Sequence, residues 1–236
     1  MFTTTCWTAV VEAGRSDSAS AQEALTRLCG TYWHPLYAYL RRLGQTEENA
    51  KDLTQEFFYL LLSKNYLRAA DRTKGRFRSF LLTALKHFLA NDKDRQLAAK
   101  RGGREIIISL NQLPEDGGAL PETGTDLTPA AIFERRWAVT LFRQAENRLR
   151  DEYADQGKAE LFARLRSCLE GETRWGSYGE LAGELGLTSA SVAMAVHRMR
   201  ARYAVLLREE VAQTLVRPTH SEIEEELRHL FEIFGG

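Results

Sequence analysis

Apolar side chains recur at three- and four-residue steps along most of the chain, which is the spacing of one buried face on an α-helix. No stretch shows the strict alternation expected of a strand ladder. We therefore expect an all-α protein. The pattern predicts helices at about 20–28, 32–43 and 47–62, one from Phe77, helical segments between 131 and 169, two helices between 177 and 207, and one after Pro218.

Residues 102–130 interrupt the helical pattern. They hold three of the five prolines and five of the seventeen glycines of the chain, and these residue types end helices and favour turns. The sequence therefore predicts two helical domains joined by a flexible linker, the second containing a helix-turn-helix. The expected divisions are a first domain at 1–101, the linker at 102–130, a second domain at 131–217 and an amphipathic acidic helix at 218–236.

The predicted helix at 47–62 has two different faces. Its apolar stripe, which we expect to be buried, consists of Ala50, Leu53, Phe57, Phe58 and Leu61. The opposite face carries polar side chains at helical spacing, namely Asp52, Gln55, Glu56 and Tyr59. A polar face opposite a complete apolar stripe is free to meet a protein partner, and the alternative is an ordinary solvated helix face.

The segment 68–104 is strongly basic, although the whole chain has a formal net charge of zero. It contains eleven Lys and Arg against three Asp, and such a block of like charge usually has a partner of the opposite sign. Its helix would bury Phe77, Leu81, Ala84, Leu85 and Phe88. The other side carries Ser79, Thr83, Lys86, His87 and Asn91, with Phe80 at the border. These groups suit a nucleic-acid surface, and they equally suit a solvated basic helix.

Residues 177–207 contain the sharpest local motif. Ser177 and Glu180 have capping-box spacing, and Gly186 can supply a left-handed turn before a second helix. The positions of Ala182, Gly186 and Val192 are those of a helix-turn-helix. Helix hairpins that never contact DNA are the alternative. The second helix would expose the candidate DNA contacts Ser189, Ser191, His197, Arg198, Arg200 and Arg202.

The remaining composition narrows the range of functions. The five histidines show no metal-ligand spacing, and no glycine-rich phosphate loop or nucleophile–base pair is visible. We therefore expect neither an enzyme nor a cofactor. Three widely spaced cysteines indicate reduced thiols in a cytoplasm rather than disulfides. No apolar run approaches the roughly 20 residues that cross a bilayer, so we expect no membrane insertion.

Three motifs together resemble the extracytoplasmic-function (ECF) sigma factors of bacterial RNA polymerase. Residues 52–58, read D-L-T-Q-E-F-F, are similar to the D-L-x-Q-E-x-F of that family's polymerase-docking helix. Residues 75–81, G-R-F-R-S-F-L, resemble its G-x-F-R-x-W-L segment, which precedes the promoter-melting helix. Residues 177–207 resemble its S-Y-x-E-I-A-x-x-L-G helix-turn-helix ending in H-R-x-R. The amino-acid sequence of residues 75–104 most resembles the ECF sigma factors of planctomycetes and related bacteria.

The resemblance implies a non-catalytic protein that binds core RNA polymerase, recognises promoter DNA and initiates transcription. It assigns polymerase binding to Asp52, Gln55, Glu56 and Tyr59. It assigns promoter melting and DNA binding to Arg76, Arg78, Phe80, Lys86, His87, Asn91 and Arg95, and reading of an upstream element to the helix-turn-helix residues given above. An anti-sigma factor or a protein kinase would be a further partner. The pattern departs from the family at His87 and Asn91, where Asn and Asp are common, and at Ala193 and Ala195, where Lys and Arg are frequent.

Two other functions fit the same helices. One is a helix-turn-helix transcriptional regulator that does not bind polymerase. Such a regulator would not need the polar face at 52–59, so this face distinguishes it from a sigma factor. The other is an adaptor that uses its basic lobe on an acidic protein and binds no nucleic acid.

The C-terminal helix is the part that the resemblance covers least. Ser221 and Glu224 have capping-box spacing, and residues 209–236 hold seven acids against two arginines. An apolar stripe is formed by Ile223, Leu227, Leu230, Phe231 and Phe234. We expect this stripe to complete the core of the second domain. The alternative is a lid that covers the basic face of 68–104 or the recognition helix.

Overall fold

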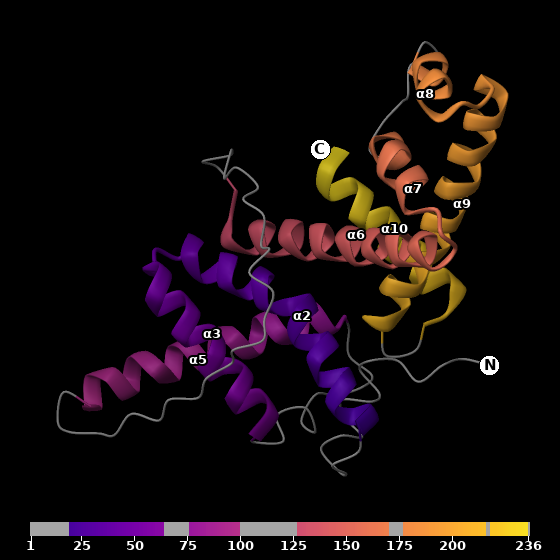
Figure 1. Ribbon diagram of the computed structural model, residues 1–236. Helices are drawn as coiled ribbons and strands as arrows, with labels where there is room; N and C mark the ends of the chain where they lie inside the picture. The colour runs from indigo at the N-terminus through magenta and orange to yellow at the C-terminus, as the bar shows by residue number, and fades with distance from the viewer. Residues whose placement is uncertain (1–18, 64–75, 100–126, 170–176, 216–217, 236) are drawn as a thin grey trace. The chain divides into compact units, whose positions relative to one another are not determined.

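The computed structural model describes residues 19–63, 76–99, 127–169, 177–215 and 218–235 (Figure 1). Every regular element within these ranges is helical, which confirms the all-α fold class. The elements are α2 (Ala19–Arg42), α3 (Glu47–Ser63), α5 (Phe77–Ala99), α6 (Pro129–Asp155), α7 (Ala159–Leu165), the 3-10 helix η1 (Arg166–Leu169), α8 (Ser177–Leu185), α9 (Ser189–Gln213) and α10 (His220–Gly235).

The chain divides into two compact units. The first unit consists of Met1–Val139 together with Ala212–Gly236, and the second unit of Thr140–Val211. Both divisions fall inside helices, one in α6 and one in α9. The expected linker at 102–130 lies almost entirely outside the described residues. The segment expected to form the second domain, 131–217, is shared between the units, and α10 groups with the first unit.

The first unit is built on α2, α3 and α5. The predicted stripe of α3 is confirmed, because Ala50, Leu53, Phe57, Phe58 and Leu61 are all buried. The stripe of α5 is also buried except at Ala84, which is partly exposed. Aromatic rings join the helices in edge and tilted contacts, with centroids 5.2 Å apart for Tyr32 and Phe77 and 5.8 Å apart for Phe57 and Phe88.

Helix α2 is continuous, although the sequence pattern predicted two helices with a break near residue 30. Pro35 lies inside the helix rather than in a first turn. A proline there removes one backbone hydrogen bond, but the apolar row runs straight past it: Leu28, Tyr32, Leu36 and Leu40 recur every four residues and are all buried. Burial of this row holds the helix together through the proline.

Helix α6 begins two residues earlier than expected. The backbone N–H of Ala131 donates to Thr128 Oγ1 at 3.2 Å, so Thr128 caps the helix, and Pro129 occupies the first helical position. Trp137 lies in the segment 131–217, which was expected to form the second domain. It is instead fully buried within the first unit, as is Phe133, because the first part of α6 packs there.

The second unit contains the rest of α6, α7, η1, α8 and α9 up to Val211. Its core is formed by Leu141, Leu149, Phe162, Leu165, Val196, Met199 and Leu206, all buried. Arg148 of α6 bridges to α9, with Nη1 2.7 Å from Glu210 Oε1 and Nη2 2.5 Å from Glu209 Oε2. Gly157, at φ +69°, makes the turn between α6 and α7.

Helix α10 begins two residues earlier than its sequence suggested. The cap is Thr219 with Glu222, not Ser221 with Glu224: Glu222 N–H donates to Thr219 Oγ1 at 3.3 Å, and Thr219 N–H donates to Glu222 Oε2 at 3.0 Å. Leu227 and Leu230 are buried as expected. Phe231 and Phe234 are 61% and 41% exposed, which corrects the predicted stripe.

Candidate functional site

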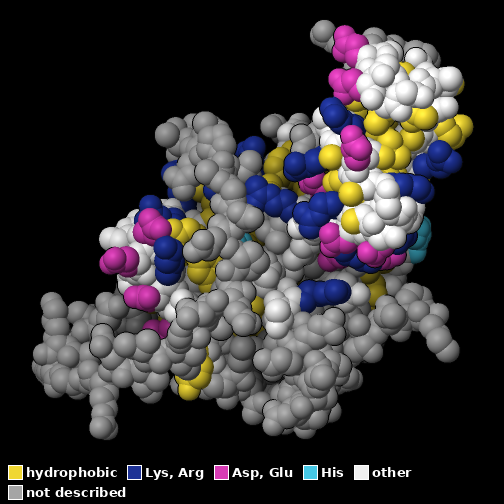
Figure 2. Space-filling view, in the orientation of Figure 1, with side chains coloured by type: hydrophobic (Ala, Val, Ile, Leu, Met, Phe, Trp, Pro, Cys, Tyr) yellow, Lys and Arg dark blue, Asp and Glu magenta, His cyan; other side chains and the backbone are white. Residues whose placement is uncertain are grey.

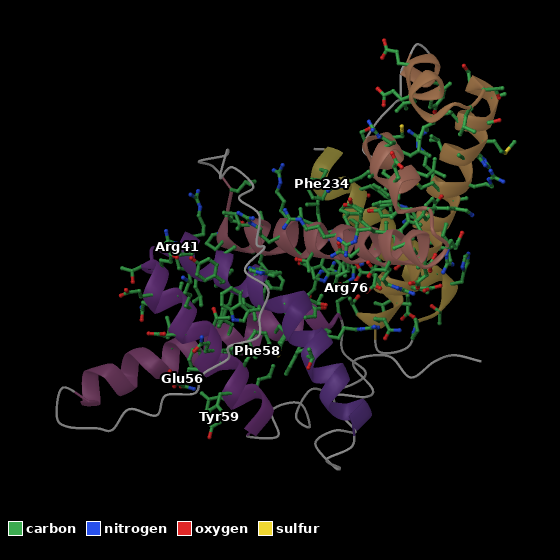
Figure 3. All side chains as sticks on the ribbon, viewed as in Figure 1. Arg41, Glu56, Phe58, Tyr59, Arg76 and Phe234 are labelled. Atoms are coloured by element: carbon green, nitrogen blue, oxygen red, sulfur yellow. The ribbon has the colours of Figure 1, made fainter. Side chains whose placement is uncertain are left out.

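The polar face of α3 is exposed beside the buried stripe. Asp52 is exposed, Gln55 and Glu56 are partly exposed, and Tyr59 is 46% exposed. Glu56 and Tyr59 lie on the outer side of α3, whereas Phe58 lies on the side that faces the bundle (Figure 3). The helix is fixed at its start by Thr46, whose Oγ1 accepts from Asn49 N–H at 3.2 Å. The structure thus brings the four predicted docking residues onto one accessible surface.

Helix α5 presents the polar side that the sequence predicted. Ser79, Thr83, Lys86, His87 and Asn91 are all exposed. Phe80 is partly exposed, and its ring stacks on Phe77 with centroids 6.0 Å apart. A partly exposed aromatic ring on the same helix as Lys86 and His87 provides a stacking surface together with hydrogen-bonding and charged groups. Arg95 lies in α5, but its side chain is outside the described residues.

Arg78 departs from its predicted role. It was expected to hold a DNA phosphate, yet its side chain is only 3% exposed. Its Nη1 donates to Glu226 Oε1 of α10 at 2.6 Å, and its Nε lies 2.8 Å from Glu134 Oε2 of α6. The guanidinium also lies 4.3 Å from the centre of the Trp137 ring. In this conformation Arg78 cannot contact DNA, because two carboxylates and an indole surround it.

Arg76, which directly precedes α5 and is labelled in Figure 3, pairs with the same carboxylate of Glu226. Its Nε lies 3.2 Å from Glu226 Oε1, and its side chain is 41% exposed. Glu134 also meets His229 of α10, with Oε2 and Nε2 3.3 Å apart. We call Arg76, Arg78, Glu134, Glu226 and His229 the arginine–glutamate cluster. It joins α5, α6 and α10 within the first unit.

Helices α8 and α9 are joined by a short turn with the expected local features. Gly186 has φ +63°, and Leu187 N–H donates to Ala182 O at 2.9 Å. Thr188 caps α9 through Ser191 N–H at 3.2 Å. The inward positions Ala182, Val192, Val196 and Met199 are all buried. The left-handed glycine, the threonine cap and the buried positions that the pattern predicted are thus present between α8 and α9.

Four of the candidate DNA contacts lie on the exposed side of α9, namely Ser189, Ser191, His197 and Arg198. Met194 at 56% exposed and Leu187 at 45% exposed lie among them. Figure 2 shows the resulting mixture of hydrophobic and charged side chains over α8 and α9. This surface offers apolar contacts as well as polar ones, which suits thymine methyl groups in a major groove.

Two of the candidate DNA contacts, Arg200 and Arg202, have partners within the second unit. Arg200 donates from Nε and Nη2 to Cys168 O of η1, at 2.9 and 2.6 Å. Arg202 binds Glu152 of α6 in a bidentate pair, with distances of 2.8 and 2.6 Å. The hydrogen bond from Arg202 lowers the pKa of Glu152 below its ordinary value. Both arginines therefore tie α9 to its neighbours in this conformation.

Glu134 and Glu226 were not identified from the sequence as site residues. A signal for Glu226 exists, because it is three residues after Ile223 and four before Leu230, on the apolar row of its helix. Glu134, beside the buried Phe133, carries no comparable signal. Within the described ranges, no group of three His, Cys, Asp or Glu is arranged to hold a metal ion. No helix in these ranges is long and apolar enough to span a membrane.

Comparison with protein-family models, with curated proteins and with solved structures found no match to this chain.

Proposed function

We propose that this protein is an ECF-type sigma factor, which binds core RNA polymerase through α3 and promoter DNA through α5 and α9. The observation that carries the proposal is the first unit's pair of exposed polar faces. One, on α3, is acidic and amide-bearing with Tyr59 at its edge; the other, on α5, is basic and polar with Phe80 at its edge. Two chemically different surfaces on adjoining helices suit two different partners.

The face of α5 has the chemistry that opened DNA requires. Unpaired bases are held by stacking on aromatic rings and by polar groups on their edges. Phe80 offers part of its ring, and Lys86, His87 and Asn91 lie exposed on the same helix. We therefore assign this face to the melted strand of the promoter.

The geometry of the second unit supports a role for α9 in recognising promoter bases. Its turn and caps place Ser189, Ser191 and Met194 on the exposed side of the first turns of the helix. This is the part of a recognition helix that reaches base edges in the major groove. Few free charges accompany it, so we expect this unit to bind duplex DNA weakly unless polymerase holds it in place.

Binding to core polymerase is the decisive experiment. The chain is mixed with purified bacterial core RNA polymerase, and the affinity is compared for the wild type, Asp52→Ala/Gln55→Ala and Glu47→Ala/Lys51→Ala. The last variant is a matched control, because Glu47 and Lys51 form an exposed ion pair of 2.8 Å on the same helix and are not among the four predicted docking residues. We expect the first double variant to bind about tenfold or more weakly and the control to bind like the wild type.

Transcription gives the second readout. Core polymerase with the wild-type chain should transcribe a subset of a random promoter library that core polymerase alone does not transcribe. Absence of both core binding and chain-dependent transcription would contradict the proposal. If DNA binding persisted without polymerase binding, the protein would be a transcriptional regulator of another kind.

A further inference from the structure

The arginine–glutamate cluster places a buried positive charge where the proposed function requires an accessible one. Arg78 and Arg76 lie at the N-terminal end of the DNA-facing helix α5, yet both are bound to Glu226 of α10. Glu226 is itself only 1% exposed. A buried ion pair stabilises a fold poorly in comparison with apolar residues of similar size. Packing alone therefore does not explain why a glutamate occupies this position.

Glu226 matches the arginines as a phosphate would. A guanidinium presents its N–H donors in a fixed fork that suits the oxygens of carboxylates and phosphates alike. Here Oε1 of Glu226 accepts from Nη1 of Arg78 and also lies 3.2 Å from Nε of Arg76. One anionic oxygen thus bridges two arginines, as a non-ester oxygen of a DNA backbone can.

The fit of α10 in this position is incomplete. Within the described part of the chain, Glu226 Oε2 and Trp137 Nε1 are buried polar atoms without a hydrogen-bond partner. Both belong to side chains that contact Arg78. Buried polar atoms of this kind weaken the docked state. Phe231 and Phe234 also stay 61% and 41% exposed, so α10 buries only part of its apolar surface.

Helix α10 is also built as a separate acidic element. It has its own capping box at Thr219 and Glu222, and between His220 and Gly235 it carries five glutamates against one arginine. Its partner helix α5 lies in the most basic segment of the chain. An independently capped acidic helix can leave the basic one without unwinding.

We propose that Arg76 and Arg78 form a phosphodiester-binding site and that α10 is its internal ligand, which DNA displaces. Glu226 occupies the site in the closed conformation of the structure. When α10 leaves, both guanidiniums become available to backbone phosphates next to the exposed face of α5. The free protein is thereby restrained from binding nucleic acid. This inference rests on the proposed function, since it concerns the same DNA-binding helix.

The test measures binding of a short fluorescein-labelled DNA by the full-length chain over a range of salt concentrations. Glu226→Gln keeps the shape of the side chain and removes its charge. Glu225→Gln is the matched control, because Glu225 is exposed on the same helix and the change in net charge is identical. We expect Glu226→Gln to bind about fivefold or more tightly than the wild type. Its logarithmic salt dependence should be steeper by about one to two units. The control should change affinity by less than about twofold.

Two further measurements make the result specific. Adding Arg78→Ala to Glu226→Gln should abolish the gain, because the gain is carried by that guanidinium. In the wild-type chain, which needs no substitution, saturating DNA should accelerate hydrogen exchange of the α10 amides while the amides of α3 keep their protection. If Glu226→Gln binds no more tightly than Glu225→Gln, or if α10 stays protected in the DNA complex, the inference is wrong.

Measuring core polymerase binding with the same preparations distinguishes a failure of the internal-ligand inference from a failure of the sigma-factor proposal. If polymerase binding is intact and the α10 results are negative, the sigma-factor proposal stands and only the internal ligand fails. If neither polymerase nor DNA binds any variant, the proposed function fails and the inference fails with it.

Discussion

Arg78 shows how one side chain can depart from the role that its type suggests. Along α5 it precedes Leu81 by three residues and Leu85 by seven, so it lies on the buried row of the helix. Glu226 precedes the buried Leu230 by four residues, so it also lies on the buried row of its helix, α10. Opposite charges on two apolar rows are a signal of mutual burial. Reading Arg78 only as part of a basic segment overlooks its position on the helix.

The first prediction concerns the energetics of this pair. Arg78→Met should destabilise the protein by about 3–5 kcal/mol, because it removes the buried counter-charge of Glu226 and leaves only the partly exposed Arg76 beside it. Arg78→Met combined with Glu226→Leu should be less destabilised than Arg78→Met alone, since no buried charge then lacks a partner at that position. Urea denaturation of the four proteins of the cycle measures this. Simple additivity of the two single effects would show that the pair is not coupled.

The second prediction concerns pH. The hydrogen bond from Arg202 lowers the pKa of Glu152 from its ordinary value of 4.5. A carboxyl with a depressed folded pKa adds stability above its unfolded pKa and loses it as the pH falls through the folded value. The pair is partly exposed, so its contribution at neutral pH should be only about 0.2–1 kcal/mol. The difference in thermal midpoint between wild type and Glu152→Gln should therefore shrink as the pH drops from 6 to below about 4.

The matched control for that titration is Asp151→Asn. Asp151 is exposed next to Glu152, and its ion pair is with its sequence neighbour Arg150 rather than with α9. The stability of this variant relative to wild type should vary less with pH than that of Glu152→Gln. An equal variation would assign the effect to net charge instead of to the bridge between α6 and α9.

At the scale of single helices, the start signals were the most predictable features. Thr46 and Thr188 cap α3 and α9 as the sequence indicates, and Gly44 and Gly186 adopt the left-handed turns that end helices. The start of α10 was predicted two residues too late, because the sequence around it contains two overlapping capping boxes. The earlier one, at Thr219, prevails because it adds two residues to the helix.

The third prediction follows from that choice. Thr219→Ala should destabilise α10 by about 1 kcal/mol, because Glu222 N–H loses its acceptor and Glu222 Oε2 loses the hydroxyl donor of Thr219, while the backbone N–H of residue 219 remains. Ser221→Ala should have much less effect, since Ser221 lies within the first turn rather than at the cap. Hydrogen exchange of the α10 amides distinguishes the two. Equal effects, or a larger effect at Ser221, would favour the later capping box.

Helix packing was harder to predict than helix position. The burial of Phe57, Phe58 and Leu61 follows from their spacing alone, and so does the exposure of Asp52 and Tyr59. The placement of Trp137 does not, because periodicity shows that a residue is buried without showing which helix covers it. Its neighbour Arg78 is 59 residues earlier in the chain, and no local rule connects the two.

At the scale of the whole molecule, the chain leaves the first unit in α6 and returns to it at the end of α9. The fourth prediction tests this arrangement by deleting residues 218–236. The deletion exposes the surface that Leu227 and Leu230 cover in the first unit. Faster hydrogen exchange should therefore appear in α2, α3 and α5, with little change in α8. Selective loss of protection in the second unit would support the original expectation that α10 completes that unit's core.

The distance along the chain between Arg78 and Glu226 also sets an order of events during synthesis. The two residues are 148 positions apart, which a ribosome covers in about 7–30 s at typical rates of elongation. Throughout that interval Arg78 exists without the carboxylate of α10, while the whole second unit is made and can fold. The helices translated first thus belong to the unit that is finished last.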